Sequence, residues 1–512
     1  MDNTEKLVFG KANIKGVVGL EVADDIAEVF VQDKDGGITS VFVPNRFWIL
    51  SNKNINGKFA KLKGDLHYKW GTQFKDRATW SKCRGAWKKS DDIFSVWNAE
   101  ESLMMKDGIT FYQDLKLKDV SLLSWDIETT GLDGTASDAK VLLISTTYRD
   151  QHKQVNKLFS YDEYETEADL LDAFSEYIQE TNPSLILGHN IFAFDFPYMQ
   201  ARADASGTQL AWGRDGSAVE FEDYESKFRL DGTRDLLYKK VRVYGREICD
   251  TFFLANSYDV SKSIESYALK PMIKQLGLEK AGRQYYDAGD IRKNYKNPVE
   301  FTKIKQYAED DAEDPVKLWD LMGPLYFNMA TMFPKPFTEI LLSASGGKIN
   351  GMMCRAYLQD GHSLPKADER QDYMGALSFA VPGIYSNCFK IDLAALYPSI
   401  MIEYEVFDDT KDPNGYLLQF VKIFRAKRLE YKKLAADTGE DYWREMDTTA
   451  KSILNSFYGF CGTGGLNFNS FSCADFITAK GREILEYTIK WASGRPLTDF
   501  VKDETMDEEE SA

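Results

Sequence analysis

Histidine, paired cysteine and long apolar runs are the features that this sequence of 512 residues has least of. Four His argue against a His-built metal centre, and six scattered Cys without a C-x-x-C pair argue against a zinc ribbon or an iron–sulfur cluster. Such cysteines indicate reduced thiols in a cytosol. No apolar run approaches the ~18 residues of a membrane span, and the N-terminus lacks the charged-then-apolar order of a signal peptide. We therefore expect a cytoplasmic protein without membrane contact.

The net charge of -17 taken alone disfavours nucleic acid, but the charge is distributed unevenly. Residues 161–180 and 499–512 are acidic, whereas residues 58–89 are basic with interleaved Trp, Tyr and Phe. Lys and Arg neutralise phosphates, and aromatic rings stack on bases, so residues 58–89 are a candidate nucleic-acid platform. The alternative is a solvated basic face with its Trp side chains in the core, and the sequence leaves both open.

The length predicts three or four domains. Residues 1–115 have short alternating strands and turns, which predict a β-rich N-terminal domain that we expect to return at residues 326–385. From residue 118 the pattern changes to apolar strands mixed with helices, which indicates an α/β sheet domain. We expect strands at 120–128, 140–150, 156–162, 184–190 and 389–398, and helices at 167–183, 416–439 and 446–460. The fold class is therefore α+β with several domains.

Carboxylates with metal-ligand spacing recur in the predicted α/β domain. Asp126 and Glu128 are two apart on a strand, so they face the same way. Asp195 follows at a strand-to-helix junction, and Tyr307 and Asp311 are at i and i+4 on one helix face. Carboxylates suit hard cations such as Mg²⁺. Two ions about 4 Å apart would activate a water and stabilise the leaving oxygen in phosphodiester cleavage.

Each of these elements has an ordinary structural alternative. A lone D-x-E on a strand is commonly a solvent-facing pair, Asp195 could be a helix cap, and "EDDAED" could be a charged helix face. Asp310 could be mistaken for the ligand, but only Asp311 keeps the i+4 spacing from Tyr307. The order of three such elements, each on the appropriate secondary structure, favours the functional interpretation.

The sequence here resembles the 3′–5′ proofreading exonuclease of family B DNA polymerases, which has a ribonuclease-H-like fold. The resemblance lies in "DIET", "HNIFAFD" and "YAEDD". It implies that Asp126, Glu128, Asp195 and Asp311 hold two Mg²⁺ or Mn²⁺ ions and that Tyr307 orients the water. It implies DNA contacts at Asn190 and Phe194.

The resemblance continues in "DLAALYPSIM", which is similar to polymerase motif A with Ala395 and Met401 where Ser and Ile are usual. It implies that Asp392 binds both catalytic metals, assisted by the Leu393 backbone carbonyl, and that Tyr397 excludes a ribose 2′-OH by its size. It also implies that Leu396 contacts the bound nucleotide.

Two helical stretches after motif A resemble the fingers of such polymerases. Arg428 and Lys432 are at i and i+4, as are Lys451 and Asn455 in "KSILNSFYG", which matches motif B. Arg suits bidentate phosphate binding and Lys is a point charge, so these side chains would hold the triphosphate of a dNTP. Taken alone, the first stretch could be a solvated helix and the second a core helix ending at a Gly cap.

The resemblance also implies DNA contacts outside the nuclease motifs. "YMGA" is similar to the Y-x-G-A element that holds template strand, and the end of motif B would face the nascent base pair. The expected residues are Tyr373, Gly375, Ala376, Tyr458 and Gly459.

A third palm motif, Y-G-D-T-D-S or similar, would follow motif B and provide the second catalytic Asp, but no such motif is present. The sequence also lacks a thumb. We therefore expect the N-terminal portion of a split or truncated polymerase, in which Asp392 is half of a site. The alternatives are a stand-alone 3′–5′ exonuclease and a non-catalytic DNA-binding assembly subunit. The short fingers and the lack of metal-binding Cys most resemble a phage or viral replicase, which would place the protein in the host cytoplasm.

The expected partners are primer–template DNA, dNTPs and a C-terminal subunit with motif C and the thumb. A sliding clamp is a further candidate partner. A partial palm would leave an unpaired sheet edge for the partner to cover. We expect residues 386–400 and 470–498 to form the interface with that partner. The expected domains are the β-rich domain (1–115), the exonuclease (116–325), palm with motif A (386–415), fingers with motif B (416–468), partial palm (469–498) and an acidic tail (499–512).

Overall fold

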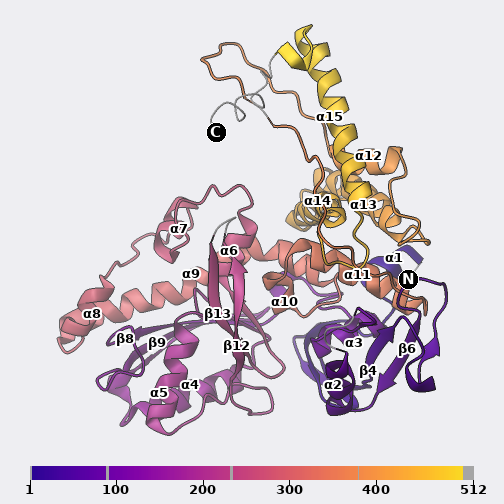
Figure 1. Cartoon of the computed structure of the whole chain (residues 1–512). Helices are drawn as coiled ribbons and strands as arrows, with labels where there is room; N and C mark the ends of the chain where they lie inside the picture. Colours follow the sequence, from indigo (N-terminus) through magenta and orange to yellow (C-terminus); the bar gives the residue numbers. More distant parts are fainter. Residues whose placement is uncertain (1–2, 88–90, 231–233, 379, 500–512) are drawn as a thin grey trace, which may run out of the picture.

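The computed structural model describes residues 3–87, 91–230, 234–378 and 380–499 (Figure 1). The N-terminal part contains two small antiparallel sheets, with strand orders β1-β2-β3 and β5-β6-β4-β7. This confirms the expected β-rich character of the N-terminal region. The elements here are α1 (Asn3–Phe9), β1 (Val17–Val22), β2 (Ile26–Gln32), β3 (Ile38–Pro44), β4 (Phe47–Ser51), β5 (Ala60–Lys61), β6 (Trp70–Phe74), α2 (Arg77–Ala86), β7 (Ile93–Phe94) and α3 (Ala99–Asp107).

The position of Trp80 on α2 bears on whether the Trp side chains of residues 58–89 lie in the core or stack on bases. Its side chain is 2% exposed, and its indole N–H donates to the backbone carbonyl of Trp48 at 3.1 Å. Trp80 is therefore a core residue rather than a base-stacking platform. The neighbouring Lys58, Lys61 and Lys63 are exposed.

A five-stranded mixed sheet with strand order β10-β9-β8-β11-β14 forms the centre of the second part. Strand β8 pairs antiparallel with β9 and parallel with β11, so it lies in the middle of the sheet. The strands are β8 (Leu122–Thr129), β9 (Val141–Arg149), β10 (Gln154–Ser160), β11 (Leu185–Gly188) and β14 (Glu247–Asp250). The strands predicted at 120–128, 140–150, 156–162 and 184–190 are thus confirmed, with small shifts at their ends.

Helices surround this sheet, and the long helix α9 contacts both β8 and β9. The helix predicted at 167–183 is α4. The remaining elements are α4 (Glu167–Thr181), α5 (Asp195–Ser206), the hairpin β12 (Glu220–Arg229) and β13 (Asp235–Arg242), α6 (Thr251–Tyr258), α7 (Leu269–Gln275), α8 (Ala288–Asn294) and α9 (Pro298–Ala330). Short 3-10 turns lie at Ile55–Gly57, Leu117–Asp119, Tyr161–Glu163 and Leu497–Asp499.

Residues 326–385 lead back to the N-terminal part mainly through helices. After the end of α9 come α10 (Phe337–Leu342) and α11 (Ser345–Gln359), and only single bridges at His362 and Leu364 join the N-terminal strands. Nine of the fifteen residues of α11 are buried, including the run from Gly351 to Tyr357. Helix α11 therefore lies in the core, where it contacts α3 of the N-terminal part.

The C-terminal part is helical, with α12 (Leu396–Glu403), α13 (Tyr416–Thr438), α14 (Asp441–Cys461) and α15 (Phe471–Ser493). Helices α13 and α14 pack against each other as a hairpin, which confirms the two helices predicted at 416–439 and 446–460. Figure 1 shows α15 extending away from the rest of the molecule. The predicted acidic tail lies almost entirely outside the described residues.

The strand predicted at residues 389–398 is wrong. Residues 389–395 have no regular secondary structure, and α12 begins at Leu396. A strand needs a neighbour to satisfy its backbone hydrogen bonds, and no described strand pairs with this segment. Phe389, Ile391 and Leu393 are instead exposed, by 78%, 41% and 40%.

Two further observations concern the whole chain. No described helix is both long enough and apolar enough to cross a membrane. The six cysteines, all within the described ranges, are free of disulfide bonds.

Candidate functional site

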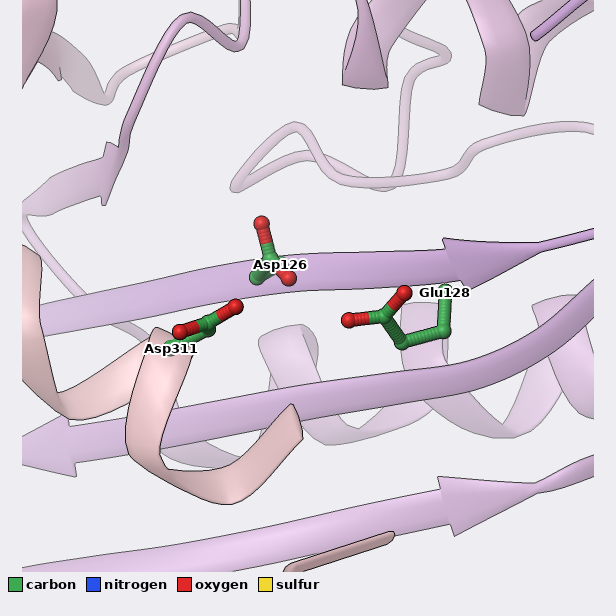
Figure 2. A group of neighbouring side chains, drawn as sticks. All are labelled: Asp126, Glu128 and Asp311. Atoms are coloured by element: carbon green, nitrogen blue, oxygen red, sulfur yellow. The ribbon is translucent and has the colours of Figure 1, made fainter. Parts of the chain in front are cut away.

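Three carboxylates converge between the central strand and the long helix. Asp126 and Glu128 project from β8, and Asp311 projects from α9 toward the same space (Figure 2). One ligand atom from each residue lies within 4.8 Å of the other two. The alternation of β8 therefore places the D-x-E pair on one face, as expected from the sequence.

Burial and mutual repulsion make this cluster unfavourable without a cation. Burial raises the pKa of Glu128 to about 8, and the charge of Asp311 adds to the shift. Burial also raises the pKa of Asp126 well above its usual range, and the charges of Asp195 and Glu128 raise it further. Hard divalent ions prefer such oxygen donors, and their charge would offset the repulsion. The donor set therefore fits Mg²⁺ or Mn²⁺.

Asp195 lies beside this cluster as the first residue of α5. Its side chain is 3% exposed, and its Oδ1 atom has no hydrogen-bond partner among the described residues. Burial raises the pKa of Asp195 to about 8, and the charge of Asp250 adds to the effect. A buried carboxylate oxygen without a partner is costly, so Asp195 is suited to become a further ligand of a bound cation.

Asp250 shapes the loop that leads to Asp195, and the sequence analysis missed it. Its two carboxylate oxygens accept the backbone N–H groups of Asn190, at 2.8 Å, and Phe192, at 3.1 Å. Asn190 has a left-handed φ of 64°, which these contacts hold in place. Phe194 is half-buried just before α5. The available sequence signal was an Asp at the end of a buried strand directly before a helix.

Tyr307 and Asp311 share one face of α9, as predicted, and two basic side chains meet them there. Lys270 on α7 donates to the Tyr307 hydroxyl and lies 3.3 Å from Asp311 Oδ2. Arg283 donates to Asp311 Oδ1 and to Asp314. The sequence analysis did not identify either basic residue, since neither belongs to a recognisable motif.

The side chain of Asp310 contacts residues outside the carboxylate cluster. Its Oδ1 lies 3.4 Å from Lys280 Nζ, and its Oδ2 accepts the backbone N–H of Gln284 at 3.1 Å. The i+4 argument for Asp311 over Asp310 therefore agrees with the geometry.

Three tyrosines from separate stretches of sequence meet near α15. The rings of Tyr397 and Tyr458 have centroids 4.4 Å apart, and the hydroxyls of Tyr373 and Tyr458 lie 3.3 Å apart. A Cβ at Gly481 of α15 would lie 2.9 Å from the Tyr397 ring, so only Gly permits this approach. The three elements singled out in the sequence as Y-x-G-A, motif A and motif B thus form one aromatic cluster.

The backbone of the Y-x-G-A element is held by α15. Arg482 donates to the carbonyls of Met374, at 2.6 Å, and Gly375, at 2.5 Å. Thr478 donates to Met374 at 3.0 Å. Ala376, next in the chain, is exposed.

The other candidate nucleotide-binding residues are spread over α13 and α14. Lys451, Asn455 and Gly459 follow at i, i+4 and i+8 on one exposed face of α14. Lys432 on α13 is exposed as well. Arg428 lies 3.2 Å from Asp447 of α14, so this guanidinium is engaged across the helix hairpin.

Asp392 stands apart from the nuclease cluster. It is exposed in the irregular segment before α12, as is Leu393, and Leu396 is the first residue of that helix. Within the described ranges, the only group of three potential metal ligands is that of Asp126, Glu128 and Asp311. Asp392 therefore belongs to no group of three potential metal ligands among the described residues.

Comparisons with known proteins match two separate parts of the chain to one family. The exonuclease domain of DNA polymerase family B matches residues 74–272, and DNA polymerase family B matches residues 405–510. The first range contains Asp126, Glu128 and Asp195. Tyr307, Asp311 and Asp392 lie outside the matched ranges.

Individual relatives are archaeal DNA polymerases. The chain is 25% identical over 355 residues to the DNA polymerase of Archaeoglobus fulgidus, covering 64% of this chain and 42% of that protein. It is 24% identical over 441 residues to the DNA polymerase of Pyrococcus glycovorans, covering 78% and 54%. The structure of the family B DNA polymerase from Pyrobaculum calidifontis superimposes with a TM-score of 0.73 at 17% identity, covering 92% of this chain and 71% of that one.

The chain thus combines the mixed α+β fold of a polymerase with an exonuclease domain. It belongs to the family B DNA polymerases. It spans about half of the length of the two polymerases compared by sequence.

Proposed function

We propose that this chain is the N-terminal part of a replicative DNA-directed DNA polymerase and that it carries a 3′–5′ proofreading exonuclease. The carboxylate cluster of Asp126, Glu128 and Asp311 is the observation that carries this proposal. The unpartnered oxygen of Asp195 supports a fourth ligand. When bound by these residues, two Mg²⁺ or Mn²⁺ ions supply a nucleophilic water and stabilise the leaving oxygen of the primer terminus.

The other residues of the nuclease site act on the substrate and on the water. Tyr307 would orient the attacking water through its hydroxyl, since it shares its helix face with Asp311. Asn190 and Phe194 would contact the unpaired 3′ end of the primer from the loop that Asp250 holds. An aromatic side chain at Phe194 suits stacking on a base.

The polymerase role of the chain rests on the residues around α12 to α15. Tyr397 would lie beneath the incoming sugar, and the face of α14 with Lys451 and Asn455 would meet the triphosphate of the dNTP. Tyr373, Gly375, Ala376, Tyr458 and Gly459 would contact the template strand and the nascent base pair. The cluster of Tyr373, Tyr397 and Tyr458 supports these assignments, because it joins the three motifs at one place.

We propose further that a second polypeptide completes the polymerase site in trans with motif C and the thumb. The support is that Asp392 belongs to no described group of three potential metal ligands, and that apolar side chains are exposed on the segment before it and on α15. Ile384 and Phe389 are 104% and 78% exposed, and Tyr487 and Trp491 of α15 are 65% and 81% exposed. Residues 386–400 and 470–498 would form the interface, and a strand of the partner would pair with residues 389–395.

Primer extension and primer degradation by the pure chain test this proposal. A labelled primer–template is incubated with Mg²⁺, with and without dNTPs, and the products are separated by length. Degradation without extension is the expected result. Extension by the chain alone would show that an unidentified acid completes the site of Asp392, and absence of both activities would favour the assembly-subunit hypothesis.

A stand-alone 3′–5′ exonuclease remains the second candidate, because the described residues supply the whole carboxylate cluster. The two candidates differ in what a second chain adds. Copurified chains that separate on dilution, without gain of extension on mixing, would favour the stand-alone exonuclease. A phage or viral origin, location in the host cytoplasm and use of a sliding clamp are part of the proposal for the polymerase.

A further inference from the structure

Lys270 contacts both Tyr307 and the carboxylate cluster. Among the described residues, no other basic side chain does so. It is the second residue of α7. Its ammonium donates to the Tyr307 hydroxyl, lies 3.3 Å from Asp311 Oδ2 and stands 4.1 Å from the centroid of the Tyr307 ring. A single cation therefore fixes both the phenol and the carboxylate.

Lys270 differs from Arg283, the other cation at Asp311. The Arg283 side chain is 1% exposed and bridges Asp311 to Asp314, so it belongs to the interior that supports α9. The Lys270 side chain is 31% exposed. Lys270 thus approaches the carboxylate from the open side, where metal ions and DNA would also enter.

The hydroxyl of Tyr307 has a defined direction in this arrangement. The Lys270 ammonium can only donate, so the phenol oxygen accepts from it. The phenol in turn donates its own proton to the Asp311 carboxylate, since these two side chains are hydrogen-bonded. Loss of Lys270 would remove this donor and leave the direction of the hydroxyl less well defined, although the buried ring stays packed.

We propose that Lys270 is a positioning residue of the nuclease, which directs the Tyr307 hydroxyl and balances part of the negative charge of the carboxylate cluster. This inference rests on the proposed exonuclease function. Lys270 then has two opposed effects: it weakens divalent-ion binding by its like charge, and it speeds excision by holding Tyr307. The two effects can be measured separately.

Lys270→Met removes the charge and keeps most of the apolar stem. In DNA-free protein, it should tighten Mn²⁺ binding by about tenfold, because a unit charge within ~4 Å of a ligand oxygen is no longer there to repel the ion. Binding is measured by electron paramagnetic resonance, since the signal of free Mn²⁺ is lost on binding. At saturating Mn²⁺, kcat for excision should fall about 10–100-fold, as for other groups that orient a ligand, with little change in KM for DNA.

Two further variants separate position from charge. Lys270→Arg keeps the charge and the donor, so its Mn²⁺ affinity and its kcat for excision should lie between those of Lys270→Met and the wild type. Lys274→Met removes an exposed positive charge from the same helix without any recorded contact to the cluster, and it should behave as wild type. Thermal unfolding of all three variants confirms that each is folded.

Unchanged Mn²⁺ binding and unchanged kcat in Lys270→Met would overturn the inference, as would equal effects in Lys274→Met. Absence of excision by the wild-type chain would instead overturn the proposed function. In that case the Mn²⁺ titration still measures the effect of Lys270 on the carboxylates.

Discussion

The ring of Tyr397 packs against the ring of Tyr458, with centroids 4.4 Å apart and planes inclined by 44°. The first residue comes from α12 and the second from α14, so the contact joins motif A to motif B. Gly481 of α15 leaves just enough room for the Tyr397 ring. The position of this phenol is thus fixed by two helices besides its own.

Tyr397→Ala should admit ribonucleotides into the assembled polymerase. The phenol is proposed to exclude a 2′-OH by its bulk, and differences of this size in a pocket are worth about 10–200-fold in selectivity. The ratio of kcat/KM for dNTP and rNTP incorporation, measured with the partner chain present, checks this. Tyr397→Phe keeps the ring and should discriminate as wild type; equal discrimination by the Ala variant would contradict the assigned role.

Replacing both Asp126 and Glu128 by Ala should abolish excision while the assembled enzyme still extends primers. Loss of two proposed ligands should cost more than the 10–100-fold that is typical for residues that only orient a ligand, so we expect a decrease of more than about 100-fold. Single-turnover degradation of a 3′-labelled primer measures it. Asp310→Asn is the matched control, because Asp310 faces Lys280 instead. Excision that survives the double change would remove the carboxylate cluster from the mechanism.

The parts of the nuclease site that could be predicted are those set by local geometry. Asp126 and Glu128 share a face because strands alternate, and Tyr307 and Asp311 share a face because four residues make about one helical turn. Lys270 approaches Asp311 from 41 positions earlier in the chain. Such contacts depend on how α7 packs, so no spacing in the sequence reveals them.

One prediction of secondary structure is wrong for a physical reason. The strand expected at 389–398 depends on a neighbouring strand that the described residues do not provide, so its apolar pattern could not decide its conformation. The domain boundaries and the roles of individual site residues remain predictions.

Glu247 should make the stability of the protein depend on pH. Burial raises its pKa to about 7, and its Oε2 accepts from the backbone and the hydroxyl of Thr338 without a cation in contact. The folded state therefore binds the proton more strongly than the unfolded state. The stabilising contribution is present below pH 4.5 and is lost as pH rises through 7, by up to about 3 kcal/mol for a shift of this size.

Glu247→Gln keeps the oxygen acceptor and removes the titration. Its melting temperature should therefore fall less than that of the wild type between pH 5 and pH 8, measured by differential scanning calorimetry. The exposed Glu225 on β12 provides the control, since Glu225→Gln should preserve the wild-type slope. Parallel pH profiles for the wild type and Glu247→Gln would show that Glu247 is not the group responsible.

Trp80→Ala should destabilise the N-terminal part by about 3–5 kcal/mol, the usual cost of removing a large buried aromatic side chain. The indole is 2% exposed and its N–H is bonded to a buried carbonyl, so the change opens a cavity and leaves an acceptor unpaired. Urea unfolding followed by circular dichroism measures the loss. Trp491→Ala, at an 81% exposed position, should change stability by no more than about 0.5 kcal/mol.

The same variant distinguishes the two interpretations of the basic segment. If Trp80 serves only the core, the affinity of folded Trp80→Ala for labelled single-stranded DNA, measured by fluorescence anisotropy, should equal that of the wild type. A base-stacking role would instead cost about 1–3 kcal/mol of binding free energy for the base that stacks on the ring. The exposed Lys58, Lys61 and Lys63 could still bind phosphates in either case. Their replacement together by Gln should then reduce DNA affinity mainly at low salt, because phosphate contacts weaken as counterions accumulate.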